Sequence, residues 1–371
     1  MNTIALHRFC LVAVLGLAIA AGFARPVQAQ ATPDAQTILK GIEPLSEAAR
    51  EKRLIEGAKK EGKVVWYTVD SPKSTQLLAD AFSKKYPFVE VQFIRAKSRA
   101  LTDRIVTETR ANRYLFDVAT TTTESFNTYP VEDVFALYKS PVKDRLPANM
   151  KADRWAGLFI FVRGIGYNTN LVKPADVPKT WEDLLHPRWK GKIMFDESSV
   201  QEVTTMYKKW GKEKTGAYFD KLAQSGNLQL QRGRNVIAQL LAAGEAPLGV
   251  TVYAYEMEQY MQKGAPVDWV LVDPMPGPIA IASVGRRAPN PYAAALLYDF
   301  LLGQDGQKVF ASMNRVPTNP QVKSNSARVD AAMKDPKLHV AEVIDAGGTI
   351  REEIISILDD KILKVLLEKM K

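Results

Sequence analysis

Two tyrosines that lie close together in the chain are well suited to hold a small molecule. Tyr253 and Tyr255 follow the β-rich run 247–252, so alternation along an extended backbone would send both rings to the same face. Aromatic rings on one face can stack on an organic ligand. The pattern therefore predicts that Tyr253 and Tyr255 line a ligand site.

Three arginines lie on segments that are predicted to face the same site. Arg163 follows the apolar stretch 158–162, and an arginine there needs an anionic partner or exposure, because an unpaired buried charge is very costly. Arg232 and Arg234 precede a predicted helix at 235–243, where guanidinium groups beside a helix amino terminus could bind a carboxylate or a phosphate. The alternatives are a structural salt bridge for Arg163 and a solvated surface position for Arg232 and Arg234.

Polar side chains also follow the predicted strands, in the loops where ligands bind in open α/β sheets. Their oxygens could bond a ligand, whereas the alternative roles are helix capping for Ser71 and Ser98 and a surface turn for 120–123. The ligand-binding positions predicted in these loops are Thr68, Asp70, Ser71, Ser98, Arg99, Thr120, Thr121, Glu197 and Ser198.

The elements that position these loops alternate between short β-rich runs and amphipathic helices. Strands are expected at 63–68, 89–94 and 116–120, with helices at 74–85 and 98–112 between them. This order is typical of an α/β fold, with a mostly parallel sheet covered by helices on both faces.

Two extended stretches divide the chain into two predicted lobes. A second set of α/β units begins near 158–167, and the stretch 279–284 could carry the chain back to the first lobe. An amphipathic helix at about 351–370 is expected to pack on the first lobe. We therefore predict two hinge crossings, with the first lobe formed by 30–160 and 284–371 and the second lobe by 161–283.

The first 29 residues have the parts of a secretory signal: a basic start at Arg8, an apolar run at 11–21 and the cleavage site Val27-Gln28-Ala29. The apolar run is too short for a membrane span, which needs about 20 apolar residues. Cys10 is the only cysteine, so the exported chain would have neither a disulfide nor a thiol nucleophile. We expect cleavage after Ala29 and a free periplasmic protein.

The charge pattern also bears on the partners of the protein. The formal net charge of +9 falls to about +7 once Arg8 and Arg25 leave with the signal, and this surplus could favour an anionic ligand. No dense Lys/Arg block or nucleic-acid motif stands out, so no nucleic-acid partner is expected. The chain has no Gly-x-Ser-x-Gly elbow and no zinc-spaced histidine motif, which favours a binding protein over an enzyme.

Several longer motifs resemble extracellular solute-binding proteins of ABC importers, in the group that includes ferric-iron-binding proteins. They include Val65-Trp66-Tyr67-Thr68, Gly166-Tyr167-Asn168-Thr169, Thr180-Trp181-Glu182-Asp183-Leu184, Pro187-Arg188-Trp189-Lys190-Gly191-Lys192 and Asp299-Phe300-Leu301-Leu302. The resemblance implies the type II periplasmic-binding-protein fold, with two α/β lobes and a ligand cleft between them. It also implies two partners, a small-molecule ligand and the membrane permease of the importer. We expect a monomer without a cofactor.

The resemblance raises ferric iron as an alternative ligand, which would use Tyr253, Tyr255 and Glu197. Resembling iron binders have two adjacent tyrosines at this position, and they commonly add a histidine and a carboxylate. Here Ala254 separates the tyrosines, and no histidine lies in the loop after the first strand. The interrupted pair and the three arginines favour a small organic anion.

Overall fold

The computed structural model describes residues 34–126, 128–340, 349–360 and 364. The predicted secretory signal at 1–29 lies outside these residues. Among the described helices, none combines the length and the apolar character that a membrane crossing requires.

The first large sheet combines a parallel half with an antiparallel half. Its strand order is β13-β5-β12-β3-β1-β2, with β4 paired to β5 at the side. The strands β2, β1 and β3 run parallel, whereas β12 is antiparallel to both β3 and β5. The strands are β1 (Lys63–Thr68), β2 (Glu90–Arg95), β3 (Val118–Thr122), β4 (Lys151–Ala152), β5 (Trp155–Ile160), β12 (Ile279–Val284) and β13 (Val316–Pro317).

The second sheet has the order β10-β6-β9-β7-β8. Its strand β7 is parallel to β8 and β9, and β6 is antiparallel to β9 and β10. The strands are β6 (Arg163–Asn168), β7 (Ile193–Asp196), β8 (Leu228–Gln231), β9 (Leu248–Tyr253) and β10 (Val267–Val270). A separate pair joins β11 (Met275–Gly277) to β14 (Leu338–Val340).

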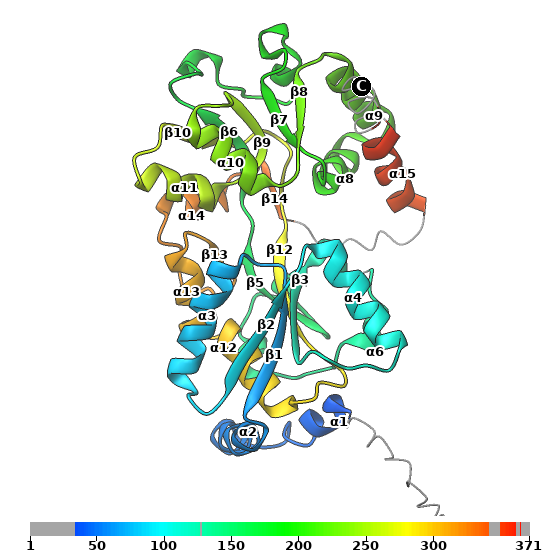
Figure 1. Ribbon diagram of the computed structural model, residues 1–371, viewed down its shortest axis with the longest axis vertical. Coiled ribbons are helices and arrows are strands. Elements are labelled where there is room, and N and C mark those ends of the chain that lie inside the picture. The colour runs from blue at the N-terminus through cyan, green and yellow to red at the C-terminus, as the bar shows by residue number, and fades with distance from the viewer. Residues whose placement is uncertain (1–33, 127, 341–348, 361–363, 365–371) are drawn as a thin grey trace, which may run out of the picture. The chain divides into compact units, whose positions relative to one another are not determined.

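Helices cover both sheets, as the alternating sequence predicts (Figure 1). On α3, Leu78 and Phe82 form a buried face at helical spacing, and Ser71 caps the amino end. The helices are α1 (Ala35–Lys40), α2 (Glu47–Glu61), α3 (Pro72–Lys85), α4 (Ser98–Arg110), α5 (Thr123–Phe126), α6 (Val131–Val134), α7 (Pro141–Asp144), α8 (Val200–Trp210), α9 (Lys212–Gln224), α10 (Arg234–Ala243), α11 (Ala254–Gln262), α12 (Pro291–Leu302), α13 (Gln304–Ser312), α14 (Ala327–Ala332) and α15 (Thr349–Leu358), with 3-10 turns at Ala148–Met150, Pro174–Asp176, Glu182–Leu185 and Pro187–Trp189.

The chain passes between the two sheets at the residues that separate β5 from β6 and β10 from β12. The sequence predicts the first passage near 158–167. The second passage precedes β12, because β12 pairs with β3 and β5, whereas the sequence pattern assigns 279–283 to the second lobe. The strand is apolar on both faces, so its composition does not reveal which sheet receives it.

The carboxyl-terminal helix α15 packs on α8 rather than on the elements of the first sheet. Glu353 accepts hydrogen bonds from the Tyr207 hydroxyl at 2.6 Å and from Lys212 Nζ at 2.8 Å. Ile354 and Ile357 are buried. This differs from the packing expected from sequence, because an amphipathic pattern specifies a buried face without specifying which element covers it.

Candidate functional site

Two buried arginines and one buried glutamate form the centre of the candidate site. Arg163 Nη1 donates to Glu202 Oε1 at 2.6 Å, and Arg234 Nη2 donates to the two Glu202 oxygens at 3.1 and 3.2 Å. Burial alone would raise the pKa of Glu202, but Arg234 and Arg163 outweigh it and lower this pKa below its usual range. The carboxylate is therefore ionised, and the triad joins β6, α8 and α10.

This triad corresponds to the structural alternative that the sequence left open for Arg163. Arg234 is also engaged, with Asp196 Oδ1 at 3.5 Å and Ser198 Oγ at 3.4 Å from its Nη1. Each guanidinium still has N–H groups to spare, because Nε of both Arg163 and Arg234 is buried without a hydrogen-bond partner among the described residues.

The two predicted tyrosines lie beside this triad. Their rings stack on each other, with centroids 5.4 Å apart and planes 20° apart. Arg163 and Arg234 lie 5.9 and 6.0 Å from the Tyr253 centroid, and Phe161 lies 5.1 Å from it. Tyr255 belongs to α11 rather than to a continuing strand, so the rings meet because the chain turns into a helix after Tyr253.

Arg315 extends the site toward the first sheet and was not identified from the sequence. It is 1% exposed, donates to Asp70 Oδ2 at 2.9 Å and to Ser74 Oγ at 3.1 Å, and lies 5.1 Å from the Tyr255 centroid. An arginine directly before Val316-Pro317 was the available signal. The stacked tyrosines therefore lie between two buried cationic groups.

Three helices begin at this site without a side-chain cap. The amino-terminal cap positions of α8, α10 and α11 are Ser199, Gly233 and Tyr253, and none of their side chains bonds the free N–H groups of its helix. Hydrogen bonds connect the three ends, from Arg234 to Glu202 and from Asn235 Nδ2 to Glu256 Oε1 at 3.2 Å. Free N–H groups and positive dipole ends of helices together favour an anion.

Comparison with known proteins identifies the family. The sequence profile described as bacterial extracellular solute-binding protein matches residues 117–340, which is more than half of the chain. The chain belongs to this family. The resemblance read from the sequence motifs is thereby confirmed, and the protein is a periplasmic-type solute-binding receptor of ABC importers.

A curated relative and two solved structures are similar to this solute-binding protein. "Iron uptake protein A2" of Synechocystis is 28% identical over 205 residues, which is 49% of this chain and 58%, less than two thirds, of that protein. Iron-bound HitA from Pseudomonas aeruginosa has a TM-score of 0.70 at 18% identity, covering 81% of this chain and 99% of its own. AfuA from Actinobacillus pleuropneumoniae, solved with fructose-6-phosphate, has a TM-score of 0.63 at 21% identity, covering 83% and 97%. These structures confirm the predicted type II fold with two lobes.

Several side chains that were predicted to bind the ligand form hydrogen bonds within the protein or are buried in a strand. Thr120 Oγ1 donates to Thr68 Oγ1 at 2.8 Å and accepts from Trp66 Nε1 at 3.1 Å. Ser71 accepts from the Ser74 N–H and thus caps α3, as the alternative had it. Thr121 is 2% exposed within β3. These side chains shape the strand ends.

The remaining predicted positions are Glu197, Arg232, Ser198, Ser98 and Arg99. Glu197 forms an ion pair with Arg232, 3.4 Å apart, and the Arg232 side chain is 85% exposed. Ser198 bonds Asp196 through both its N–H and its hydroxyl. Ser98 and Arg99 open α4, where Lys97 rather than Ser98 occupies the cap position and Arg99 is exposed.

Several buried polar atoms without partners lie in the segments that follow β3, β7 and β9. Thr123 follows β3, Ser199 and Gln201 follow β7, and Glu256 follows β9. Among the described residues, no group bonds Thr123 Oγ1, Ser199 Oγ, either amide atom of Gln201, or Glu256 Oε2. Burial raises the pKa of Glu256 to about 7, and the Asn235 amide and Arg315 only partly oppose this. Gln201 and Glu256 were not identified from the sequence, because no motif marks an unmatched group, whereas Thr123 lies in the polar run 120–123 and Ser199 follows the predicted position Ser198.

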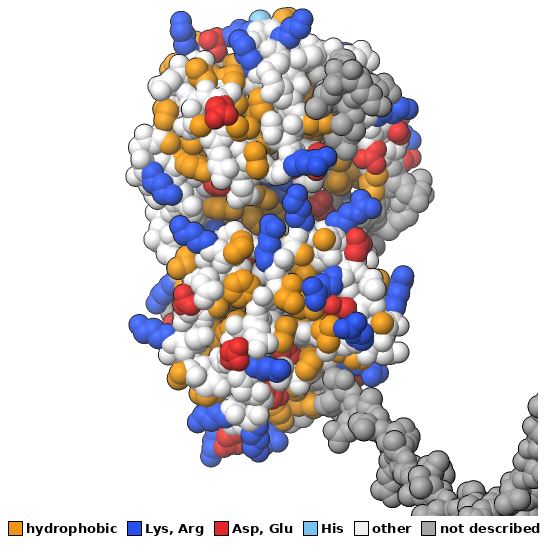
Figure 2. Space-filling view, in the orientation of Figure 1, with side chains coloured by type: hydrophobic (Ala, Val, Ile, Leu, Met, Phe, Trp, Pro, Cys, Tyr) orange, Lys and Arg blue, Asp and Glu red, His pale blue; other side chains and the backbone are white. Residues whose placement is uncertain are grey.

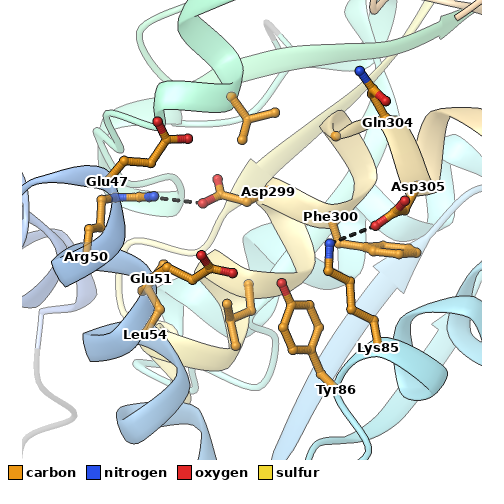
Figure 3. Close-up of a pocket in the computed structure, with 13 residues that line it drawn as sticks. Glu47, Arg50, Glu51, Leu54, Lys85, Tyr86, Asp299, Phe300, Gln304 and Asp305 are labelled. Carbon is orange, nitrogen blue, oxygen red and sulfur yellow. Dashed lines mark hydrogen bonds and ion pairs between the residues drawn. The ribbon is translucent and has the colours of Figure 1, made fainter.

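A pocket of about 220 Å3 lies elsewhere, between α2 and the junction of α12 and α13 (Figure 3). Arg50 and Asp299 face each other across it at 3.0 Å, and Lys85 pairs with Asp305 at 2.7 Å. Because its main charges are paired within the protein, we assign this pocket to the structure of the first sheet's helix layer.

The face of the molecule drawn in Figure 2 carries side chains of both charges. Figure 2 shows Lys and Arg side chains spread over the visible face, with Asp, Glu and apolar side chains among them. Within the described part of the chain, no three His, Cys, Asp or Glu side chains are grouped to hold a metal ion.

Proposed function

We propose that this solute-binding protein captures a small organic anion in the periplasm and delivers it to the membrane permease of an ABC importer. The observation that carries the proposal is the meeting of three uncapped helix ends with Arg163 and Arg234 around Tyr253.

The chemistry of this meeting point suits a carboxylate or a phosphate. The backbone N–H groups in the first turns of these helices and the unbonded Nε–H groups of Arg163 and Arg234 are all donors. Glu202 and Asp196 balance much of the arginine charge, so the helix ends supply the remaining attraction. The tyrosine ring faces would add apolar and stacking contact to the carbon skeleton of the ligand.

Ferric iron is the competing ligand, because relatives carry iron in their names. It would use Tyr253, Tyr255 and Glu197. Burial raises the pKa of Tyr255, which opposes formation of the tyrosinate that ferric iron prefers, and Glu197 is already paired with Arg232. AfuA, whose title names fructose-6-phosphate, illustrates that an organic anion is compatible with the fold.

Further properties follow from the same proposal. We infer that the protein is exported with cleavage after Ala29, that it acts as a monomer without a cofactor, and that it neither catalyses a reaction nor binds nucleic acid. Intact mass of the exported protein tests the cleavage: a mass that begins at Gln30 is expected, whereas a folded soluble form that keeps 1–29 would contradict it.

Native mass spectrometry of the protein as purified tests the nature of the ligand. We expect a noncovalent adduct that unfolding releases as a small carboxylate or phosphate. A ferric adduct with a visible tyrosinate absorption band that disappears in Tyr253→Phe or Tyr255→Phe would overturn the organic-anion proposal and favour iron.

A further inference from the structure

Four buried side chains at the carboxyl ends of three strands require partners that the described chain does not supply. Thr123, Ser199 and Gln201 are 1%, 0% and 2% exposed, and Glu256 is 9% exposed. A buried polar atom left without a hydrogen bond costs about 1–3 kcal/mol, so such atoms are normally satisfied. Their partners therefore come from a bound molecule or from water.

Gln201 and Glu256 lie in the first turns of α8 and α11, two of the helices that begin at the candidate site. Gln201 precedes Glu202, the central carboxylate of the triad, on α8. Glu256 is linked to α10 through Asn235, the residue next to Arg234. A molecule whose negative group reaches the helix ends would therefore bring its other atoms near Gln201 and Glu256.

The unmatched atoms specify what those other atoms must be. The Gln201 amide has a free donor and a free acceptor, whereas an ionised Glu256 Oε2 is an acceptor only. An ionised carboxylate or phosphate has acceptors alone, so it can satisfy the helix ends but neither Glu256 nor the Gln201 oxygen. A hydroxyl group both donates and accepts, as do the hydroxyls of Ser199 and Thr123.

We propose that the ligand is a hydroxylated organic anion, and that Gln201 and Glu256 select its hydroxyl groups. This inference rests on the proposed function, since it assumes that the negative group of the ligand binds at the helix ends.

Calorimetry with matched pairs of probes tests the selection. D-gluconate and hexanoate are six-carbon monoanions that differ in their hydroxyls, malate and succinate are four-carbon dianions that differ in one hydroxyl, and D-glucose is the neutral control. We expect the hydroxylated member of at least one pair to bind about tenfold or more tightly than its partner, because one additional hydrogen bond to a charged group supplies that difference.

Each other outcome has a definite meaning. Equal affinity within both pairs would overturn the hydroxyl selection, leave the anion proposal standing and assign the unmatched groups to water. Tighter binding of glucose than of every anion would overturn the proposed function itself. Failure of all five probes to bind would count against hydroxylated anions as the ligand class.

Substitutions locate the effect. Gln201→Leu should bring the affinity ratio of the hydroxylated and unhydroxylated probes close to one, whereas Gln76→Leu, on the exposed face of α3, should leave the ratio unchanged. An unchanged ratio in Gln201→Leu would contradict the role of Gln201. If Gln201→Leu does not fold, the ratio in the unmodified protein still decides the proposal.

Discussion

Two regions of this molecule are built from the same buried charges but differ in how completely these are matched. Behind the pocket in Figure 3, Asp299 accepts hydrogen bonds from Arg50 at 3.0 Å, from the Tyr138 hydroxyl at 3.0 Å and from Ser140 Oγ at 2.6 Å. Asp299 belongs to α12, and the first turn of this helix is capped by Glu61 of α2, which accepts hydrogen bonds from the Tyr292 and Ala293 N–H groups. At the candidate site the arginines are also paired, but several buried side-chain atoms have no partner among the described residues, and the cap residues of α8, α10 and α11 make no side-chain bond to their helices.

The difference teaches how to separate a structural cluster from a binding site. Burial and ion pairing occur in both regions, so neither property identifies function. The unmatched hydrogen-bonding capacity distinguishes them: it is small around Asp299, where Arg50 Nε is the unmatched atom, and large around Glu202.

The largest expected effect concerns the buried ion pairs that both regions contain. Arg234→Ala would leave Glu202 fully buried with one ion partner fewer, so the free energy of unfolding should fall by about 3–5 kcal/mol, and Arg50→Ala should cause a similar loss through Asp299. Denaturant titration measures both. The control Arg232→Ala should cost less than about 0.5 kcal/mol, because that side chain is exposed.

If Arg234→Ala lowers the free energy of unfolding by less than about 1 kcal/mol, the two regions do not share the same dependence on buried ion pairs. It would show that Arg234 is not needed to neutralise Glu202, and it would restore the original expectation that this guanidinium is held free for a ligand.

How far the sequence predicted these regions depends on the kind of feature. Periodicity and turn residues predicted the α/β elements, because these elements depend on local patterns. Tyr253, Arg163 and Arg234 were also named from the sequence as candidate site residues, since charged and aromatic residues next to apolar strands stand out. Glu202 and Arg315 were not named from the sequence, because they lie 39 and 152 positions from Arg163 in the numbering. Only the fold brings Glu202 to Arg163 and Arg315 to Tyr255.

The next largest effect concerns the carboxylates of the two regions as the pH changes. The pKa of Glu256 is raised to about 7 by burial, so its contribution to stability is complete below the ordinary pKa of about 4.5 and is lost as the pH rises through about 7. Arg315, Tyr255 and Tyr260 are the nearest charged or titratable groups. Glu256→Gln should therefore raise stability by on the order of 2–3 kcal/mol at pH 8 and change it little at pH 4.

Thermal unfolding between pH 4 and pH 8 measures this difference. Glu245→Gln, at an exposed position, is the control and should leave the pH profile unchanged. A Glu256→Gln profile parallel to that of the unmodified protein would contradict the raised pKa of Glu256.

The smallest effect compares two serines. Ser140 bonds Asp299 and the N–H groups of Val142 and Lys143, so Ser140→Ala should cost about 1–2 kcal/mol of unfolding free energy. Ser199 Oγ has no partner among the described residues, so Ser199→Ala should not lower the free energy of unfolding of the ligand-free protein. Denaturant titration checks both variants, and equal losses would show that Ser199 is bonded as Ser140 is.

Hydrogen–deuterium exchange is the most direct test of where the ligand binds. It compares the protein as purified with the same protein after unfolding, dialysis and refolding, which removes any carried-over ligand. We predict slower exchange in the as-purified sample at 196–204 and 251–257, where the helix ends meet the tyrosines, and equal exchange in both samples at 47–54 and 299–305 around the pocket of Figure 3. Protection confined to the pocket segments, or equal exchange throughout, would contradict the assignment of the binding site.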